Sequence, residues 1–171
     1  MSKRDLKKYL ADLSKPQLEE QFIEMYEKFS EVKTYYNFVF NPKEQDLVKD
    51  AKFKISNEYY PVKTKRAKLR RSTAQKIIKH FINLGVDSFI IADVMLYNIE
   101  IAQTYSAEKY IKYESFFKSM LNSYEQAVSY LIENGILDDF KSRVVAIKEE
   151  TEHQNWSNKY SFSAIVERFD Y

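Results

Sequence analysis

The residues with the clearest chemical potential form a basic segment in the middle of the chain. Between positions 61 and 80 the sequence holds eight Lys or Arg residues and no Asp or Glu. Removing these eight charges from the net charge of +2 leaves the rest of the chain at −6. A cationic segment in an acidic chain suits an anionic partner or internal pairing. The candidate anion- or polyanion-binding residues are Lys63, Lys65, Arg66, Lys68, Arg70, Arg71, Ser72 and Thr73.

The end of this segment also has the pattern of a helix start. Ser72-Thr-Ala-Gln75 has capping-box spacing, which predicts a helix from Thr73. Cations just before a helix are unfavourable unless an anion lies between Arg70, Arg71 and the free N–H groups of the first turn. That anion is a nucleic-acid phosphate, an acidic protein, a small phosphorylated ligand or a carboxylate of the same chain; otherwise the segment is a solvated linker. We favour internal pairing, because it requires no second molecule.

A second polar group lies within an otherwise apolar stretch, IIADVMLYNIEIAQTY. Asp93, Tyr97, Glu100 and Thr104 follow one another at steps of four, three and four, which places them on one face of a helix. Carboxylates in such a helix need partners. The sequence therefore predicts either a polar pocket with tuned carboxylates or ion pairs with Lys or Arg from a neighbouring helix, with His80 or the basic segment as further partners.

Other catalytic chemistry finds little support. The chain has no cysteine, only two histidines and only two glycines fifty residues apart, which excludes a thiolate zinc site and a glycine-rich phosphate loop. Glu150 and His153 have the Glu-x-x-His spacing of di-iron bundles, but His80 lacks the second copy because Ile77 precedes it by three. We expect no metal and no cofactor, and we favour a protein that is not an enzyme.

The elements that position these residues are predicted to be helices. Ser14-Lys-Pro-Gln17 is typical of a helix start and predicts a helix over about 15–29. Asn41 and Pro42 indicate another start, with Pro42 as the first helical residue, and that helix should stop before Pro61. Stretch 32–40 is rich in β-branched and aromatic residues; lacking a second strand, we expect a helix or a tight extended turn.

Both glycines have the context of a left-handed helix end. Gly85 and Gly135 follow helical patterns, and the aliphatic residue after each is expected to pack back on the last turn. A new helix start follows each of them, at Asp87 and Asp138. The resemblance between the two stretches favours a helical hairpin repeated after fifty residues, of HEAT-like type.

Apolar side chains at steps of three and four then predict one face of a long helix after Ser106. They are Tyr113, Phe117, Met120, Leu121, Tyr124, Val128, Leu131 and Ile132. The fold class is therefore all-α, an irregular helical bundle or a short stack of hairpins with about seven to nine helices. We expect a single helical domain over 1–171 with a basic connecting segment at 61–72.

Composition limits the setting in which this domain acts. Its 171 residues are 44% hydrophobic, which is enough for a core of its own. No apolar run is long enough to span a bilayer, and the N-terminal sequence MSKRDLKKYL lacks the apolar stretch of an export signal. We expect a cytoplasmic protein that does not associate with membranes.

Four stretches together resemble a family of small uncharacterised bacterial proteins, catalogued as a domain of unknown function. They are SKRDLKKYLADLSKPQLEEQ, VKTYYNFVFNPKE, STAQKIIKHFINLGVD and ADVMLYNIEIAQTY, and the resemblance covers nearly the whole chain. It implies a bacterial, single-domain, cytoplasmic protein and supplies no activity, cofactor or site residue.

Three functions follow from these observations, in order of preference. The first is a non-enzymatic module that binds an unidentified protein partner. The second is a nucleic-acid-associated protein that binds phosphates through residues 63–71. The third is an enzyme with a carboxylate-lined pocket around Asp93 and Glu100.

Overall fold

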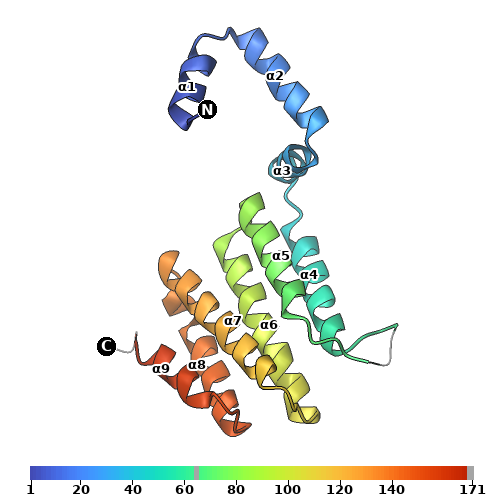
Figure 1. Cartoon of the computed structure of the whole chain (residues 1–171), viewed down its shortest axis with the longest axis vertical. Coiled ribbons are helices and arrows are strands. Elements are labelled where there is room, and N and C mark those ends of the chain that lie inside the picture. The colour runs from blue at the N-terminus through green and yellow to red at the C-terminus, as the bar shows by residue number, and fades with distance from the viewer. Residues whose placement is uncertain (64–65, 169–171) are drawn as a thin grey trace. The chain divides into compact units, whose positions relative to one another are not determined.

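The computed structural model describes residues 1–63 and 66–168. Within these ranges the chain forms nine α-helices and no strand, which confirms the predicted all-α fold (Figure 1). The helices are α1 (Lys3–Ala11), α2 (Lys15–Lys28), α3 (Ser30–Phe40), α4 (Glu44–Tyr59), α5 (Arg71–Leu84), α6 (Ser88–Glu108), α7 (Glu114–Glu133), α8 (Leu137–His153) and α9 (Lys159–Val166).

The chain divides into two compact units. Met1–Lys43 holds α1 to α3, and Glu44–Tyr171 holds α4 to α9. All the buried residues described lie between Ala51 and Val166, whereas the first unit has none. The single domain expected over the whole chain stays a prediction, which the number of unfolding transitions would test.

Helix α6 is the centre of the second unit. It packs against α4, α5, α7 and α8 (Figure 1). Nine of its residues are buried, and Val94, Leu96, Ile99 and Ala102 are completely inaccessible to solvent. A helix with buried apolar residues on several sides must be covered by several neighbouring helices. Helices α4, α5, α7 and α8 therefore form an irregular bundle around it, and α9 packs on α7 and α8.

Buried polar groups fasten α8 to this centre. The Gln103 side chain donates to the backbone carbonyl of Ile147 at 2.7 Å, and the Tyr124 hydroxyl donates to that of Val144 at 3.0 Å. Pairing of this kind removes most of the cost of placing amides and hydroxyls in a core. These bonds fix the register of α8 against α6 and α7.

The two glycine-capped turns are confirmed. Gly85 and Gly135 have φ values of 72° and 67°. Gly85 is the C-cap residue of α5, and Gly135 follows Asn134, the C-cap residue of α7. The amides of Val86 and Ile136 donate back to the carbonyls of Phe81 and Leu131, which is the Schellman pattern, and both side chains are buried.

The residues after the two turns differ. Asp87 caps α6 by accepting from the Phe89 amide, as expected, whereas Asp138 lies inside the first turn of α8. The rings of Phe89 and Phe140 lie 5.8 Å apart, so the two turns meet at the same end of the bundle.

The other predicted helices are present, but one of their predicted starts is displaced. The amide and hydroxyl of Ser14 donate to Gln17 at the start of α2, as its capping box predicts, and stretch 32–40 is helical. The expected start at Pro42 was wrong by two residues, because α4 begins at Glu44 with acidic side chains in its first turn.

The face predicted for the long helix after Ser106 was partly wrong. Met120, Tyr124, Val128 and Leu131 are buried, but Tyr113 and Ile132 are exposed. The buried face of α7 includes Phe116, Ser123 and Ala127 instead. Periodicity locates the inward stripe of a helix only approximately, because neighbouring helices decide which edge they cover.

The glycine turns provide a stability test. Gly85→Ala and Gly135→Ala should each lower the free energy of unfolding by about 1 kcal/mol or more, because an added Cβ strains a left-handed backbone. Open space surrounds both positions, so a clash does not contribute. Chemical denaturation would measure the loss. Gly→Asn at the same positions is the control and should cost less, since Asn tolerates this conformation; equal stability of all variants would contradict the assignment.

Candidate functional sites

The basic segment is fastened to the end of α4 by Glu58. One carboxylate oxygen of this buried residue accepts from Nη2 of Arg70 at 2.8 Å and the other accepts from Nε at 3.0 Å. The Glu58 backbone carbonyl accepts from the amides of Lys68 and Leu69 at 2.9 and 3.1 Å. A carboxylate of the same chain thus lies at the helix start where the sequence predicts an anion.

The expected capping box at Ser72 was wrong. Helix α5 begins at Arg71, with Arg70 as its N-cap residue, so Ser72 and Thr73 lie in the first turn. The hydroxyl of Thr73 donates to Glu58 at 2.9 Å. A carboxylate from another helix has replaced a local cap, and sequence spacing detects only local caps. The hydrogen bond from Arg70 lowers the pKa of Glu58 and outweighs the effect of its burial.

Arg71, the next residue, has a different environment. Its Nε donates to the Ser123 hydroxyl at 2.8 Å and its Nη2 to Gln126 at 2.9 Å, so its partners on α7 are neutral. Burial lowers the pKa of this guanidinium. Lys63, Arg66 and Lys68 are exposed, and Lys65 lies outside the described residues.

A cavity of about 550 Å³ lies between this segment and the first turns of α7. Its cationic lining residues are Arg66, Lys68 and Arg71, and Ser115, Ser119 and Tyr113 add hydroxyl groups. The three cations were predicted from the sequence, but the residues of α7 that complete the cavity were not. No local signal marks Ser115 or Ser119, because only the packing of α7 brings them beside residues 66–71.

The carboxylates of α6 face cations from two other helices. Asp93 accepts from Lys52 of α4 at 2.7 Å and from Arg143 of α8 at 2.8 Å. Arg143 also donates to both oxygens of Glu100. Pairing with Lys or Arg from neighbouring helices is one of the two arrangements expected from the sequence, and here Arg143 bridges the two carboxylates.

The remaining residues of the predicted polar pocket are placed differently. Tyr97 lies beneath Lys52, with Nζ 5.1 Å from the ring centre. The hydroxyl of Thr104 donates to the backbone carbonyl of Glu100. His80 is exposed on α5, and its described ring contact is with Phe81 rather than with the carboxylates. The structure therefore brings together Asp93, Tyr97 and Glu100, without His80.

Arg143 was missed by the sequence analysis, although a signal was present. It lies three residues after Phe140 and four before Ile147, on the inward side of α8. A cation on an apolar face needs a carboxylate opposite. Burial raises the pKa of Asp93, but the hydrogen bonds from Lys52 and Arg143 lower it further, so the net shift is downward. These contacts support a structural role.

The first unit exposes a large apolar surface. Helices α1 to α3 contain no buried residue. Their apolar side chains contact one another only partly, as in the edge-to-face pair of Phe22 and Tyr36. The large apolar residues of this unit that remain exposed are Met1, Leu6, Tyr9, Leu10, Phe22, Ile23, Met25, Phe29, Tyr35, Val39 and Phe40.

The described residues contain neither a cluster of metal-ligating side chains nor a membrane-spanning helix. Across residues 1–63 and 66–168, no three His, Cys, Asp or Glu side chains converge as a metal site would require. Nδ1 of His153 lies 3.8 Å from Oε2 of Glu150, but the His153 side chain is mostly exposed. None of the described helices is both long enough and apolar enough to cross a bilayer.

The fold and these sites define a small all-α protein with a carboxylate-anchored basic segment. The model of a family of unknown function, DUF6155, matches residues 1–170, so the chain belongs to that family. No curated protein and no solved structure matches it.

The contact between Glu58 and Arg70 provides a test of the basic segment. Arg70→Gln should lower the melting temperature at neutral pH, because it leaves a buried carboxylate without its cation. The pKa of Glu58 is depressed in the folded state, so the pair stabilises the fold above the ordinary Glu range and loses this effect as pH falls. The difference between variant and parent should therefore shrink toward pH 4.

Lys68→Gln is the matched control, since its exposed side chain has no carboxylate partner among the described residues. Thermal unfolding followed by circular dichroism at several pH values measures both variants. Equal melting temperatures for Arg70→Gln and Lys68→Gln would contradict the anchoring role of Glu58.

The cluster around Arg143 provides a second test. Arg143→Met should destabilise the fold by about 2 kcal/mol, because Asp93 and Glu100 lose their shared cation. The loss is smaller than for a fully buried pair, since the three side chains are 29–32% exposed. Lys52→Met, which leaves Asp93 bonded to Arg143, should cost less. Denaturant titration measures both, and an Arg143→Met protein as stable as the parent would show that the cluster is dispensable.

Proposed function

We propose that this chain is a non-enzymatic interaction module and that residues 1–43 bind a second copy of it. The observation that carries the proposal is the surface of residues 1–43, which holds eleven exposed large apolar residues and no buried one. A helical unit of this size rarely folds on its own core and commonly relies on oligomerisation. We expect the module in the bacterial cytoplasm, as the sequence predicts.

The pattern on α1 supports a helical partner. Tyr9 and Leu10 follow Leu6 by three and four positions, which places the three residues on one side of the helix. The cations Lys3, Arg4, Lys7 and Lys8 occupy the other side and its edges. An apolar stripe with basic edges suits a partner helix that has its own apolar stripe and acidic edges.

Helix α2 has that complementary character. It carries Glu19, Glu20, Glu24 and Glu27 against Lys15 and Lys28, so its charge is −2, whereas α1 with one aspartate carries +3. The one ion pair within residues 1–43 joins Lys15 to Glu19 inside α2, so the cations of α1 are not paired with α2 of the same chain. In a two-fold arrangement α1 of each copy lies against α2 of the other, and both charge sets are paired.

The contacts of the remaining candidates support a module without catalysis. Asp93 and Glu100 are held by Lys52 and Arg143, and His80 lies apart from them. A general acid or base needs a proton that it can exchange with a substrate. These carboxylates instead hold α4, α6 and α8 together.

The proposal predicts a dimer of the full chain that residues 1–43 hold together. Leu6→Gln, Leu10→Gln and Phe22→Gln combined should convert the dimer to a monomer, because these side chains are exposed in the single chain and would be covered only by the second copy. Sedimentation velocity over a range of concentrations measures the change.

The matched control replaces exposed apolar residues of the second unit, with Phe53→Gln and Tyr160→Gln, and should leave the dimer intact. The main unfolding transition should be similar in all three proteins, since no substituted residue belongs to the core. A parent protein that is monomeric at every concentration overturns the proposal, and so does a dimer that the triple variant retains.

A further inference from the structure

We propose that the cavity between residues 66–71 and the first turns of α7 binds a small phosphorylated molecule. Lys68 and Arg71 would hold its phosphate, and the apolar part of the lining would hold the group attached to it. The proposal is independent of the surface of residues 1–43, because the cavity is built entirely from residues of the second unit.

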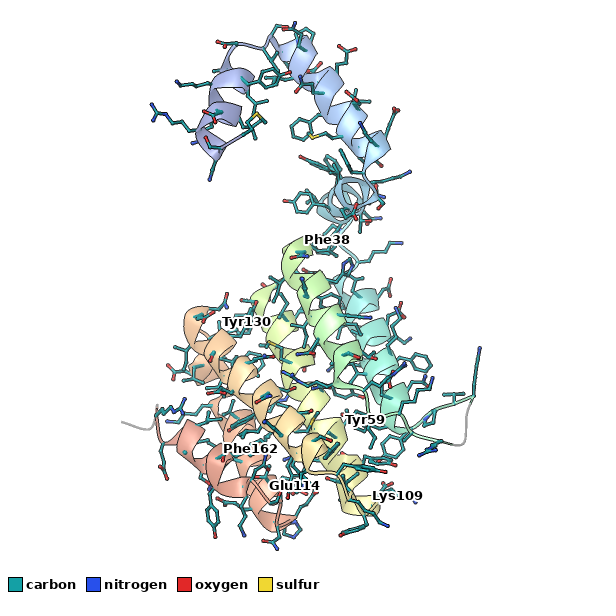
Figure 2. All side chains as sticks on the ribbon, in the orientation of Figure 1. Phe38, Tyr59, Lys109, Glu114, Tyr130 and Phe162 are labelled. Carbon is teal, nitrogen blue, oxygen red and sulfur yellow. The ribbon has the colours of Figure 1, made fainter. Side chains whose placement is uncertain are left out.

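The size and shape of the cavity suit a small ligand. Its volume of about 550 Å³ falls within the range of roughly 300–1,000 Å³ that is common for ligand pockets. One side is the segment before α5 and the other is α7, whose first residue, Glu114, is labelled in Figure 2. A pocket enclosed on two sides accepts a compact molecule better than a long polyanion, which needs an extended track.

The positive charge of the cavity lining favours an anionic ligand. Arg66, Lys68 and Arg71 are its titratable groups apart from Tyr113, and it contains no carboxylate. Glu58 neutralises Arg70, but the bonds described for Arg71 go to Ser123 and Gln126, which are neutral. A partly buried guanidinium without a carboxylate retains an unfavourable desolvation energy. A bound anion would offset that energy.

The geometry of the donors favours phosphate among anions. The bonds of Nε and Nη2 to Ser123 and Gln126 hold the Arg71 guanidinium in place, and its Nη1 group can donate to a phosphate oxygen in a charge-assisted hydrogen bond. Ser115 and Ser119 supply hydroxyl donors one helical turn apart. They lie in the first two turns of α7, a 20-residue helix whose N-terminus has no side-chain cap and carries a partial positive charge.

The rest of the lining is apolar. Phe116 and Met120 of α7 are buried lining residues, and Ala67 and Leu69 line the cavity from the segment before α5. Leu69 has a φ of 53°, a left-handed conformation that costs energy for this residue and is maintained by the bond of its amide to Glu58. An organic group on the phosphate, such as an aromatic ring, would pack on this surface, so a phosphate ester fits better than free phosphate.

The test measures binding to the full chain with four probes: inorganic phosphate, adenosine 5′-monophosphate, adenosine and a single-stranded oligonucleotide. We expect the monophosphate to raise the melting temperature and to shift the amide resonances of Ser115 and Ser119. Adenosine should do neither, because it lacks the anion. Inorganic phosphate should bind more weakly than the ester, because it leaves the apolar lining empty.

Variants separate this site from unspecific charge effects. Lys68→Gln should weaken binding of the monophosphate about tenfold, the value of one charge-assisted hydrogen bond, without changing stability. Ser115→Ala should weaken it less. Lys79→Gln, an exposed cation elsewhere on α5, is the control and should bind as the parent does. Arg71→Gln is informative only together with its melting temperature, since Arg71 also bonds to α7.

Three results would overturn the proposal. The first is an equal response to adenosine and to its monophosphate, or no response to any phosphate. The second is unchanged affinity in Lys68→Gln. The third is binding of the oligonucleotide alone, with a steep salt dependence, which would favour a nucleic-acid surface instead.

Discussion

The bundle of the second unit depends on the burial of α6, which has nine buried residues. Helices α4, α5, α7 and α8 must therefore cover most of its surface. The same requirement explains the ion pairs. Asp93 and Glu100 lie where the cover is incomplete, and Lys52 and Arg143 close that edge by satisfying both carboxylates. The polar cluster is thus a consequence of how the central helix is enclosed.

Glu58 binds only some of the cations of the basic segment, so that the adjacent residues Arg70 and Arg71 have different partners. Through its carboxylate and its backbone carbonyl it fixes Lys68, Leu69 and Arg70 at the end of α4. The carboxylate forms an ion pair with Arg70, whereas Arg71 donates hydrogen bonds to neutral side chains of α7. One internal carboxylate therefore helps to shape a cavity in which the described bonds of Arg71 go to neutral groups. Charge runs that look uniform in sequence can be divided in this way by a single tertiary contact.

The two units use amphipathic helices differently. In α4 to α9 the apolar stripes meet in a common core, whereas in α1 to α3 they remain exposed. Exposed apolar stripes on a small unit are typical of surfaces that another chain covers. A cavity in the second unit and a first unit proposed to bind another copy are compatible with one protein, because all the residues that line the cavity belong to the second unit.

The sequence by itself determined the local features, since these depend on neighbours in the chain: the all-α class, the left-handed turns at Gly85 and Gly135, the start of α2 at Ser14 and the grouping of Asp93 with Glu100 on one face. Only the tertiary structure decided which helices supply their partners. Glu58 displaced the local cap at Ser72, and Arg143 came from α8, because ion pairs across tens of residues leave no spacing to detect. The cavity beside Arg71 likewise exists only because α7 packs there, since its serines lie over forty positions away in sequence.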